Sequence, residues 1–195
     1  MLPEGAVFSN PTYNVGLRSI LCTIACRRHA LLSNDMVSQH PIHYTVMSYI
    51  QSIYHIIFRT YRSEKSIVTA HERELYAIIM KQTANLNAKL ICIGGMPDHI
   101  HLLVSLSSDL PLAKYVQAVK TFTSKWLREN PAFPDWNGWG REYAAVSYNV
   151  RDKEMIVNYI QKQKEHHRKV GFEEEYRAFL IENGIAIRKE YFLKD

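Results

Sequence analysis

The sequence lacks the features that mark secreted, membrane-spanning and nucleotide-driven proteins. Its three cysteines, Cys22, Cys26 and Cys92, are irregularly spaced, which argues against a disulfide framework and favours a reducing compartment. The hydrophobic run near the N-terminus, residues 19–26, is far shorter than the roughly 20 residues that span a bilayer. No G-x-x-x-x-G-K-S/T loop, internal repeat or low-complexity segment is present. We therefore expect a cytoplasmic protein without a membrane span, whose reaction requires no nucleotide.

What the sequence does contain is enough apolar sequence for one domain and a modest excess of positive charge. At 195 residues and 47% hydrophobic, the chain can bury a sizeable core. Its net charge of +5 suits an anionic partner such as nucleic acid. Residues 1–46 mix turn formers with short apolar patches and show no sustained period. We expect them to form a poorly ordered N-terminal leader, and residues 47–195 to form the folded domain.

The pattern after residue 47 predicts four strands and four helices. Segments rich in β-branched and aromatic residues predict strands at 49–61, 86–93, 97–106 and 143–150. Apolar residues at helical spacing predict helices at about 69–84, 109–128, 152–170 and 172–183. This order predicts an α+β fold, in which a four-stranded antiparallel sheet carries helices on one face, the ferredoxin-like split βαβ plan.

Local signals set the expected ends of these elements. The stretch from Thr69 to Glu72 fits a capping box, and Asp109 and Asp152 are expected to cap the next two helices. Gly94-Gly95 is expected to break the second strand, and the third helix is expected to run on until just before Gly171. The second helix is expected to bury one stripe, formed by Leu112, Tyr115, Val116, Val119, Phe122 and Trp126.

The third predicted strand carries the first candidate site. A period of two sends His99 and His101 to one face and the aliphatic residues Ile100, Leu102, Val104 and Leu106 to the other. The two histidines then lie about 6.5–7 Å apart along the strand. Two imidazoles at this separation can converge on one cation while the apolar face anchors the strand in a core. The alternative is a partly exposed histidine pair without a metal.

A second stretch, residues 158–163, supplies the groups that complete this site. On a helix Tyr159 and Gln163 are one turn apart and share a face. We predict that His99, His101 and Gln163 hold a divalent metal and that Tyr159 attacks a DNA phosphate. Two neutral imidazoles and one amide oxygen suit Mg²⁺ or Mn²⁺, and such an ion would activate the phosphate toward a phenol, a weak nucleophile with a pKa of about 10. The alternative for Tyr159 is a core tyrosine among apolar neighbours.

Together these motifs resemble those of the single-tyrosine HUH transposases, the insertion-sequence-200-like group, and most closely its REP-associated tyrosine transposase-like branch. The resemblance is carried by Asp98-His99-Ile100-His101-Leu102 and by Tyr159-Ile160-Gln161-Lys162-Gln163-Lys164-Glu165-His166-His167. Gly138-Trp139 and residues 172–185 support it. Because it extends from about residue 47 to residue 185, we expect residues 47–195 to be a transposase-like catalytic domain.

The resemblance implies a metal-dependent endonuclease and strand transferase that acts on single-stranded, hairpin-containing DNA through a 5′-phosphotyrosine intermediate. It matches His99 and His101 to the two histidines of the family, Gln163 to the third metal ligand and Tyr159 to the nucleophile. It also implies a homodimer, in which the tyrosine of one subunit can complete the metal site of the other. The sequence leaves open whether Tyr159 acts in its own subunit or in the partner.

Two groups of basic residues are candidates for DNA contact. The polar side of the second predicted helix carries Lys114, Lys120, Lys125 and Arg128, for which the alternative is a solvated helix face. A denser group after the tyrosine includes Lys162, His166, His167 and Arg168. Either group would track phosphates, with binding that weakens as salt rises. Trp136 and Trp139 could stack on bases or pack in their loop, and His55 and Arg59 could contact phosphate or support the metal ligands.

A function of a different class also stays open. The split βαβ plan underlies some RNA-binding sheets, so the chain could be a non-catalytic single-stranded nucleic-acid-binding module. The predicted strands, however, lack the aromatic K/R-G-F/Y-G/A-F-V-x-F/Y motif of such sheets. The same catalyst could alternatively serve a housekeeping role at repeated palindromes. HUH replication initiators and relaxases fit less well, because they are usually larger.

Overall fold

The computed structural model of the protein describes residues 49–167 and 170–195. The predicted leader, residues 1–46, lies outside these residues, so its order stays a prediction. Within the part of the chain that the structure describes, no helix is both long enough and apolar enough to cross a membrane.

Four strands form an antiparallel sheet in the spatial order β2-β3-β1-β4. They are β1 (Ser52–Arg59), β2 (Lys89–Met96), β3 (His99–Leu106) and β4 (Ala144–Tyr148). The central pair is β1 and β3, so the predicted histidine strand has a hydrogen-bonded neighbour on both sides. The predicted α+β fold with a four-stranded antiparallel sheet is confirmed.

Helices follow the strands in the predicted order. They are α1 (Glu72–Asn85), α2 (Leu112–Glu129), α3 (Lys153–Gln161), α4 (Gln163–His166) and α5 (Phe172–Glu182). Short 3₁₀ turns occupy Tyr61–Ser63, Thr69–His71 and Val150–Asp152.

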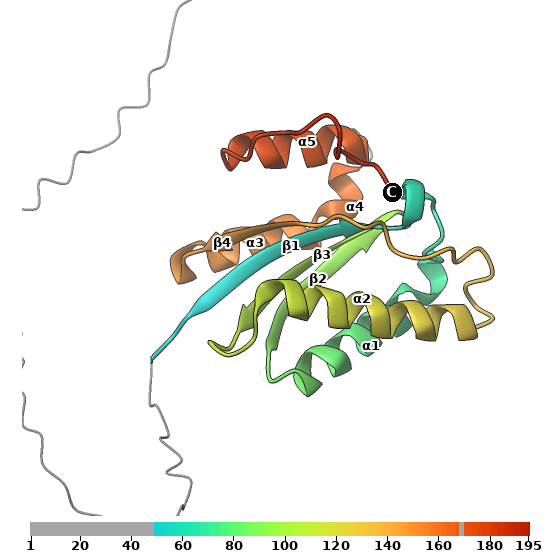
Figure 1. The fold of residues 1–195 in the computed structure, drawn as a ribbon, viewed down its shortest axis with the longest axis horizontal. Helices are drawn as coiled ribbons and strands as arrows, with labels where there is room; N and C mark the ends of the chain where they lie inside the picture. Colours follow the sequence, from blue (N-terminus) through green and yellow to red (C-terminus); the bar gives the residue numbers. More distant parts are fainter. Residues whose placement is uncertain (1–48, 168–169) are drawn as a thin grey trace, which may run out of the picture. The chain divides into compact units, whose positions relative to one another are not determined.

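One face of the sheet is apolar and is covered by α1 and α2 (Figure 1). From β3, Ile100, Leu102 and Val104 point to this face and are fully buried. They belong to one cluster with aliphatic residues of α1 and with Tyr115 and Val119 of α2. Each buried aliphatic side chain contributes about 1.5–3 kcal/mol, so this layer holds β3 firmly in place.

The opposite face of the sheet is covered by α3 and α5 (Figure 1). Ile160 of α3 packs with Leu103 of β3, and Phe179 of α5 packs with Ile57 of β1. The prediction that the helices lie on one face is therefore wrong in this detail. The physical reason is that β1 and β3 also carry apolar residues on their second face, and these residues need a second layer to be buried.

The predicted helix caps do not form. The first helix, α1, starts after His71 rather than at Thr69, and α2 starts after Pro111 rather than at Asp109. Asp152 precedes α3, but its side chain makes no capping hydrogen bond. Thr69 and Asp152 instead lie inside the 3₁₀ turns that lead into the helices, which leaves them unable to serve as ordinary N-caps.

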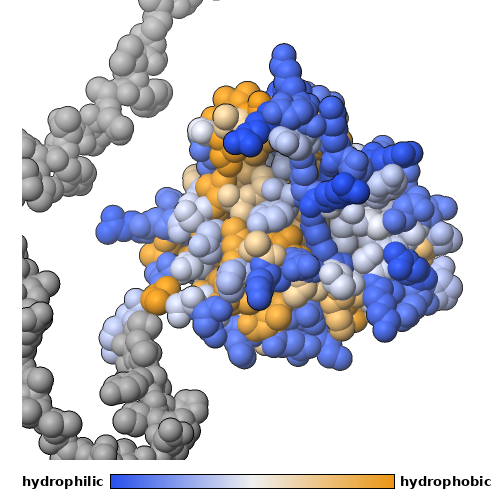
Figure 2. All heavy atoms as spheres, in the orientation of Figure 1, coloured by the Kyte–Doolittle hydropathy of each residue, from blue (hydrophilic) through white to orange (hydrophobic). Residues whose placement is uncertain are grey.

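The predicted stripe of α2 is confirmed except at its edge. Tyr115 and Val119 are fully buried, whereas Phe122 is 40% exposed and was wrongly assigned to the stripe. The buried row continues through Thr123 and Leu127 instead. On the face shown in Figure 2, hydrophobic residues likewise reach the surface between hydrophilic side chains.

The second strand, β2, continues through Gly94 and Gly95 to Met96, so the prediction that it breaks at the glycines is wrong. A Cβ added to Gly94 would lie 2.7 Å from the backbone oxygen of Ile160 in α3. Gly94 therefore serves the close approach of a helix to a strand rather than a turn, whereas a Cβ added to Gly95 would meet the backbone of His99 and Ile100 on β3.

The helix that carries Tyr159 ends at Gln161, although the pattern predicts that it runs to Gly171. Lys162, with φ −90° and ψ 7°, departs from helical geometry, and α4 begins at Gln163. The assumption that Tyr159 and Gln163 share one continuous helix is therefore wrong. No glycine or proline marks this break, so the sequence gives no local signal for it.

Candidate functional site

The strand β3 presents His99 and His101 on the face that α3 and α5 cover. Both side chains are fully buried, and Ile100 and Leu102 point to the opposite face. The alternation predicted from the sequence is confirmed. A buried histidine needs partners for its ring nitrogens, so the surroundings of each ring decide what it can do.

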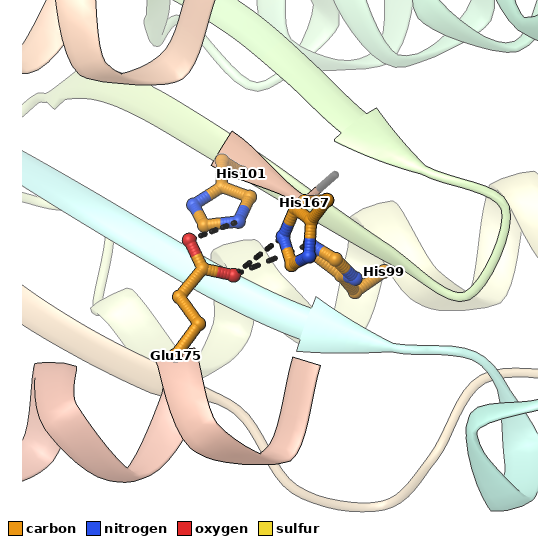
Figure 3. A group of neighbouring side chains, drawn as sticks. All are labelled: His99, His101, His167 and Glu175. Atoms are coloured by element: carbon orange, nitrogen blue, oxygen red, sulfur yellow. Dashed lines mark ion pairs between the residues drawn. The ribbon is translucent and has the colours of Figure 1, made fainter. Parts of the chain in front are cut away.

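A carboxylate from α5, that of Glu175, enters the space between these histidines (Figure 3). Its oxygens lie 3.6 Å from His99 Nε2 and 3.8 Å from His101 Nε2. They also lie 2.7 Å from His167 Nε2. One ligand atom from each residue lies within 4.8 Å of the others. We call this group the His–Glu cluster: His99, His101, His167 and Glu175.

The charges of the cluster are set by burial and by mutual contact. Burial works to raise the pKa of the Glu175 carboxyl, but His167 and His101 together hold it well below its ordinary value. Burial works to lower the pKa of His167, but the Glu175 carboxylate raises it above its ordinary value. Burial, then the charge of His99, places the pKa of His101 far below the usual range. The carboxylate is therefore ionised, and the His101 ring is neutral with a free lone pair.

The Nδ1 atom of each of the two histidines on β3 has a polar partner. His99 Nδ1 lies 2.6 Å from Asp98 Oδ1, and His101 Nδ1 lies 3.0 Å from Nε2 of His55 on β1. Burial lowers the pKa of His55 to about 4, so this ring is neutral and its Nε2 can accept a hydrogen bond from His101 Nδ1. Such partners fix the ring and its tautomer and leave Nε2 with a lone pair, as in metal-binding histidines. His55 thus supports the site, one of the two roles that the sequence allowed for it.

Tyr159 of α3 reaches the cluster within the same chain. Its hydroxyl donates a hydrogen bond to Glu175 Oε1, and its ring centroid lies 5.9 Å from that of His101. Burial, followed by the charge of Glu175, raises the pKa of the phenol above its ordinary value, so Tyr159 is protonated at neutral pH. A pocket of about 420 Å³ opens beside the tyrosine, and its lining includes Tyr148, His166 and Phe179.

Gln163 of α4 is close enough to the Tyr159 hydroxyl to oppose, in part, the rise in the pKa of that phenol. Gln163 is only 1% exposed, and neither amide atom has a hydrogen-bond partner among the described residues. The Nε2 atoms of His99 and His101 are likewise buried without a hydrogen bond. Each buried polar atom without a partner costs about 1–3 kcal/mol. Several such lone-pair donors around one carboxylate fit a divalent cation, which would satisfy them together.

The residues of the first predicted DNA-binding group do not all face solvent in the structure. Lys114, Lys125 and Arg128 are exposed on α2, so they are free to meet a phosphate. Lys120 instead points inward and donates hydrogen bonds to the backbone carbonyls of residues 140, 141 and 142. Burial lowers its pKa to about 8. Its role is to hold the loop before β4, which argues against the predicted contact with DNA.

The residues of the second predicted DNA-binding group also differ in exposure. Lys162 and His166 are exposed near Tyr159. His167 turns inward to Glu175 and belongs to the His–Glu cluster, so its assignment to the DNA-contacting surface is corrected. Arg168 lies outside the described residues.

The tryptophans and Arg59 have structural partners. Trp136 Nε1 donates to Ser124, and Trp139 Nε1 donates to Thr123, so both rings pack against α2 rather than stand ready for bases. Arg59 forms a buried ion pair with Asp195, at 2.9 Å.

Sequence reasoning missed Glu175 as a site residue. It is the third glutamate of the run 173–175, and it occupies the buried side of α5 next to Tyr176. A carboxylate on the apolar stripe of an amphipathic helix is the signal that could have found it, because buried carboxylates are rare without a partner.

Fold and site together define a class of protein: an α+β domain whose sheet carries a buried histidine pair, a carboxylate and a tyrosine hydroxyl, a set of groups suited to metal-assisted chemistry. The family of IS200-like transposases matches residues 48–163. This span is more than half of the chain and includes His99, His101, Tyr159 and Gln163. The chain therefore belongs to the IS200-like transposase family and is an enzyme of the kind that cleaves and rejoins DNA.

The chain is also similar to one curated transposase in sequence and to one solved structure in fold. The chain is 26% identical over 117 residues to the ISDra2 transposase TnpA of Deinococcus radiodurans, a match that covers 56% of this chain and 82% of that protein. In fold it is similar to the solved structure of the REP-associated tyrosine transposase bound to a REP hairpin. That likeness has a TM-score of 0.50 and 17% identity, and covers 63% of this chain and 73% of the other.

Proposed function

We propose that this protein cleaves and rejoins single-stranded DNA at hairpins, with Tyr159 as the nucleophile. His99, His101 and Gln163 are the proposed ligands of a divalent metal, Mg²⁺ or Mn²⁺. The observation that carries the proposal is the contact between the Tyr159 hydroxyl and the carboxylate at the centre of the histidines. A phenol with no chemical task would not need to be placed against a buried, charged cluster.

The residues of this site have separate roles in the proposed phosphoryl transfer. A divalent ion at this site would supply positive charge to the phosphate oxygens and align them for in-line attack. His99 and His101, held by Asp98 and His55, keep their lone pairs in fixed directions. The Tyr159 oxygen forms the new bond to phosphorus, and its proton has Glu175 Oε1 as an acceptor in the structure.

Bond exchange at the phosphate sets the products. As the Tyr159 oxygen bonds to phosphorus, the 3′ oxygen leaves and takes a proton, which yields a 5′-phosphotyrosine and a free 3′-hydroxyl. One phosphodiester replaces another, so the step is nearly neutral in energy and reversible. This reversibility explains how one enzyme can both cut and rejoin without nucleotide hydrolysis.

The position of Tyr159 bears on whether it acts in its own subunit or in a partner subunit. Because Tyr159 contacts Glu175 of the same chain, we propose that each subunit can attack with its own tyrosine. The homodimer and the exchange of tyrosines between subunits stay predictions, as do the cytoplasmic location and the division into a leader, residues 1–46, and a catalytic domain, residues 47–195. A hairpin substrate is supported by the REP hairpin named for the similar solved structure.

A covalent-adduct assay tests the proposal directly. Full-length protein is mixed with Mn²⁺ and a labelled single-stranded oligonucleotide that contains a hairpin, and the products are separated on a denaturing gel. We expect a labelled protein band with the wild type, and none with Tyr159→Phe or with chelator. The matched control is Tyr54→Phe, since Tyr54 packs against the core on the other face of the sheet and should leave the adduct unchanged.

Two outcomes would overturn the proposal. An adduct that survives Tyr159→Phe would show that another residue is the nucleophile. Wild-type protein that binds the oligonucleotide but yields no adduct over a panel of hairpins would support the non-catalytic nucleic-acid-binding module instead.

A further inference from the structure

We propose that His167 and Glu175 are also ligands of the metal, so that three imidazole nitrogens and one carboxylate oxygen bind the ion in addition to the amide oxygen of Gln163. The inference rests on the metal site proposed above and extends it to residues beyond the span that matches the family, which ends at residue 163. It concerns how this chain holds the ion and does not depend on which residue attacks DNA.

The distances within the cluster are those of ligands that share an ion. Two ligands with bonds of about 2.0–2.2 Å to one ion lie at most roughly 4.4 Å apart. Glu175 lies 3.6 Å from His99 Nε2 and 3.8 Å from His101 Nε2, beyond the range of about 2.7–3.2 Å of good hydrogen bonds. With all four ligand atoms within 4.8 Å of one another, small side-chain movements complete the set.

His167 is oriented as the other two histidines are. Its Nδ1 donates a hydrogen bond to the backbone oxygen of Val170, at 3.0 Å, and its Nε2 faces Glu175. Three rings thus have Nδ1 engaged by an outer partner and Nε2 directed at the same carboxylate. Metal-binding histidines show this pattern, because the outer hydrogen bond fixes the ring with its lone pair toward the ion.

Without an ion, the contacts of Glu175 with two of the three histidines, His99 and His101, are unfavourable. When Nδ1 of His99 and of His101 carries the proton, each Nε2 directs a lone pair at the negatively charged oxygens of Glu175. Acceptors that face one another at these distances repel, and all of these side chains are almost completely buried, so water does not screen them. A divalent cation between them turns the same contacts into bonds.

The proposed ligand set connects the ion to the nucleophile. Glu175 Oε2 is the oxygen nearest His99 and His167, whereas Oε1 accepts the hydrogen bond from Tyr159. One carboxylate therefore spans the ion and the phenol and holds the hydroxyl at a fixed place beside the metal. Three nitrogen ligands also favour Mn²⁺ over Mg²⁺, because Mg²⁺ prefers oxygen.

Binding of Mn²⁺ alone tests the inference without DNA. Titration of metal-free, full-length protein, followed by the electron paramagnetic resonance signal of free Mn²⁺, gives the affinity. We expect Glu175→Gln and His167→Ala each to weaken binding at least about tenfold, as loss of even an outer partner of a metal ligand costs 10–100-fold. Glu174→Gln is the matched control, since Glu174 is the exposed neighbour on the same helix and should bind as the wild type does.

A second measurement covers the case in which Glu175→Gln fails to fold. Pulsed electron paramagnetic resonance of wild-type protein with Mn²⁺ counts the coupled imidazole nitrogens, and we expect three. Only two coupled nitrogens, or Mn²⁺ affinity unchanged in folded Glu175→Gln and His167→Ala, would overturn the inference and leave the proposed nuclease intact. Conversely, three nitrogens in a protein that never forms a DNA adduct would sustain this ligand set and remove the proposed function.

Discussion

The two faces of the central sheet differ in what they bury. Toward α1 and α2, β3 places Ile100, Leu102 and Val104 in an apolar core. Toward α3 and α5, the same strand places His99 and His101 against a carboxylate. The first face gains free energy from burial alone, whereas the second buries polar groups that need a partner to be stable.

This difference teaches how a small domain can tolerate a buried polar site. A strand between two neighbours, anchored by its apolar side chains, keeps the imidazoles of its other side in fixed positions. Precise placement of this kind is what metal and nucleophile chemistry requires. Stability and function should therefore be separable by substitution of adjacent residues in β3.

The prediction with the largest expected effect separates stability from metal binding and catalysis. Leu102→Ala should destabilise the protein by about 2–5 kcal/mol, because it leaves a cavity in the packed layer, and should leave Mn²⁺ affinity within a fewfold of wild type under conditions where the protein is folded. His101→Ala should abolish detectable adduct formation and weaken Mn²⁺ binding, with a smaller loss of stability in the absence of metal than Leu102→Ala. Urea unfolding in chelator and Mn²⁺ titration measure the two properties. Equal losses of both in each variant would contradict the division between the faces.

The next prediction concerns pH, to which only the polar face should respond in this range. Burial lowers the pKa of His55 from 6.5 to about 4, so between these values the unfolded chain binds a proton that the folded chain does not. The free energy of unfolding should therefore fall as pH drops from 6.5 to 4, by about 3 kcal/mol from His55 at 1.36 kcal/mol for each pKa unit. His101, whose pKa is also lowered, acts in the same direction.

The contribution of one residue can be isolated by urea unfolding at several pH values in chelator. His55→Gln keeps a polar partner for His101 but cannot titrate, so its stability should depend less steeply on pH over the same range. His167 acts in the opposite direction, because its raised pKa favours the folded state below 6.5. A pH dependence that is identical in wild type and His55→Gln would mean that His55 does not titrate as its burial requires.

The same contrast explains how much the sequence could predict. Period-two alternation predicts which face each residue of β3 takes, so His99 and His101 could be placed correctly from the sequence. The contacts of Glu175 and His55 with these histidines could not be predicted, because they arise only through packing between segments far apart in the chain. Local pattern carries no information on which residues of α5 will face which residues of β3.

Helix ends were the weakest part of the prediction for a related reason. Thr69 and Asp152 have the residue types of caps, but both are used in 3₁₀ turns that depend on how the chain enters the sheet layers. Gly94 in β2 accommodates the close packing of α3, which is a tertiary constraint, and the break at Lys162 has no local signal in the sequence. Propensity alone is too weak to outweigh such packing.

The prediction with the smallest expected effect concerns whether α2, on one side of the sheet, contacts the DNA away from the cleavage site. Lys125 and Arg128 are exposed on α2, whereas Lys162 and His166 are exposed beside Tyr159. If α2 tracks the phosphate backbone, Lys125→Ala with Arg128→Ala should weaken binding of the hairpin oligonucleotide several-fold at low salt. It should also reduce the slope of log affinity against log salt by about 0.7–0.9 for each phosphate that is no longer neutralised.

The paired control is Lys162→Ala with His166→Ala, which should slow adduct formation at saturating DNA because these residues border the reacting tyrosine. The α2 variant should form adduct at the wild-type rate once DNA is saturating, since Lys125 and Arg128 would only position the strand. Binding titrations at several salt concentrations, together with single-turnover adduct kinetics, give both quantities. An α2 variant with an unchanged salt slope would show that this helix face is simply solvated, and would leave the polar face of the sheet as the only one of the two layers that engages DNA.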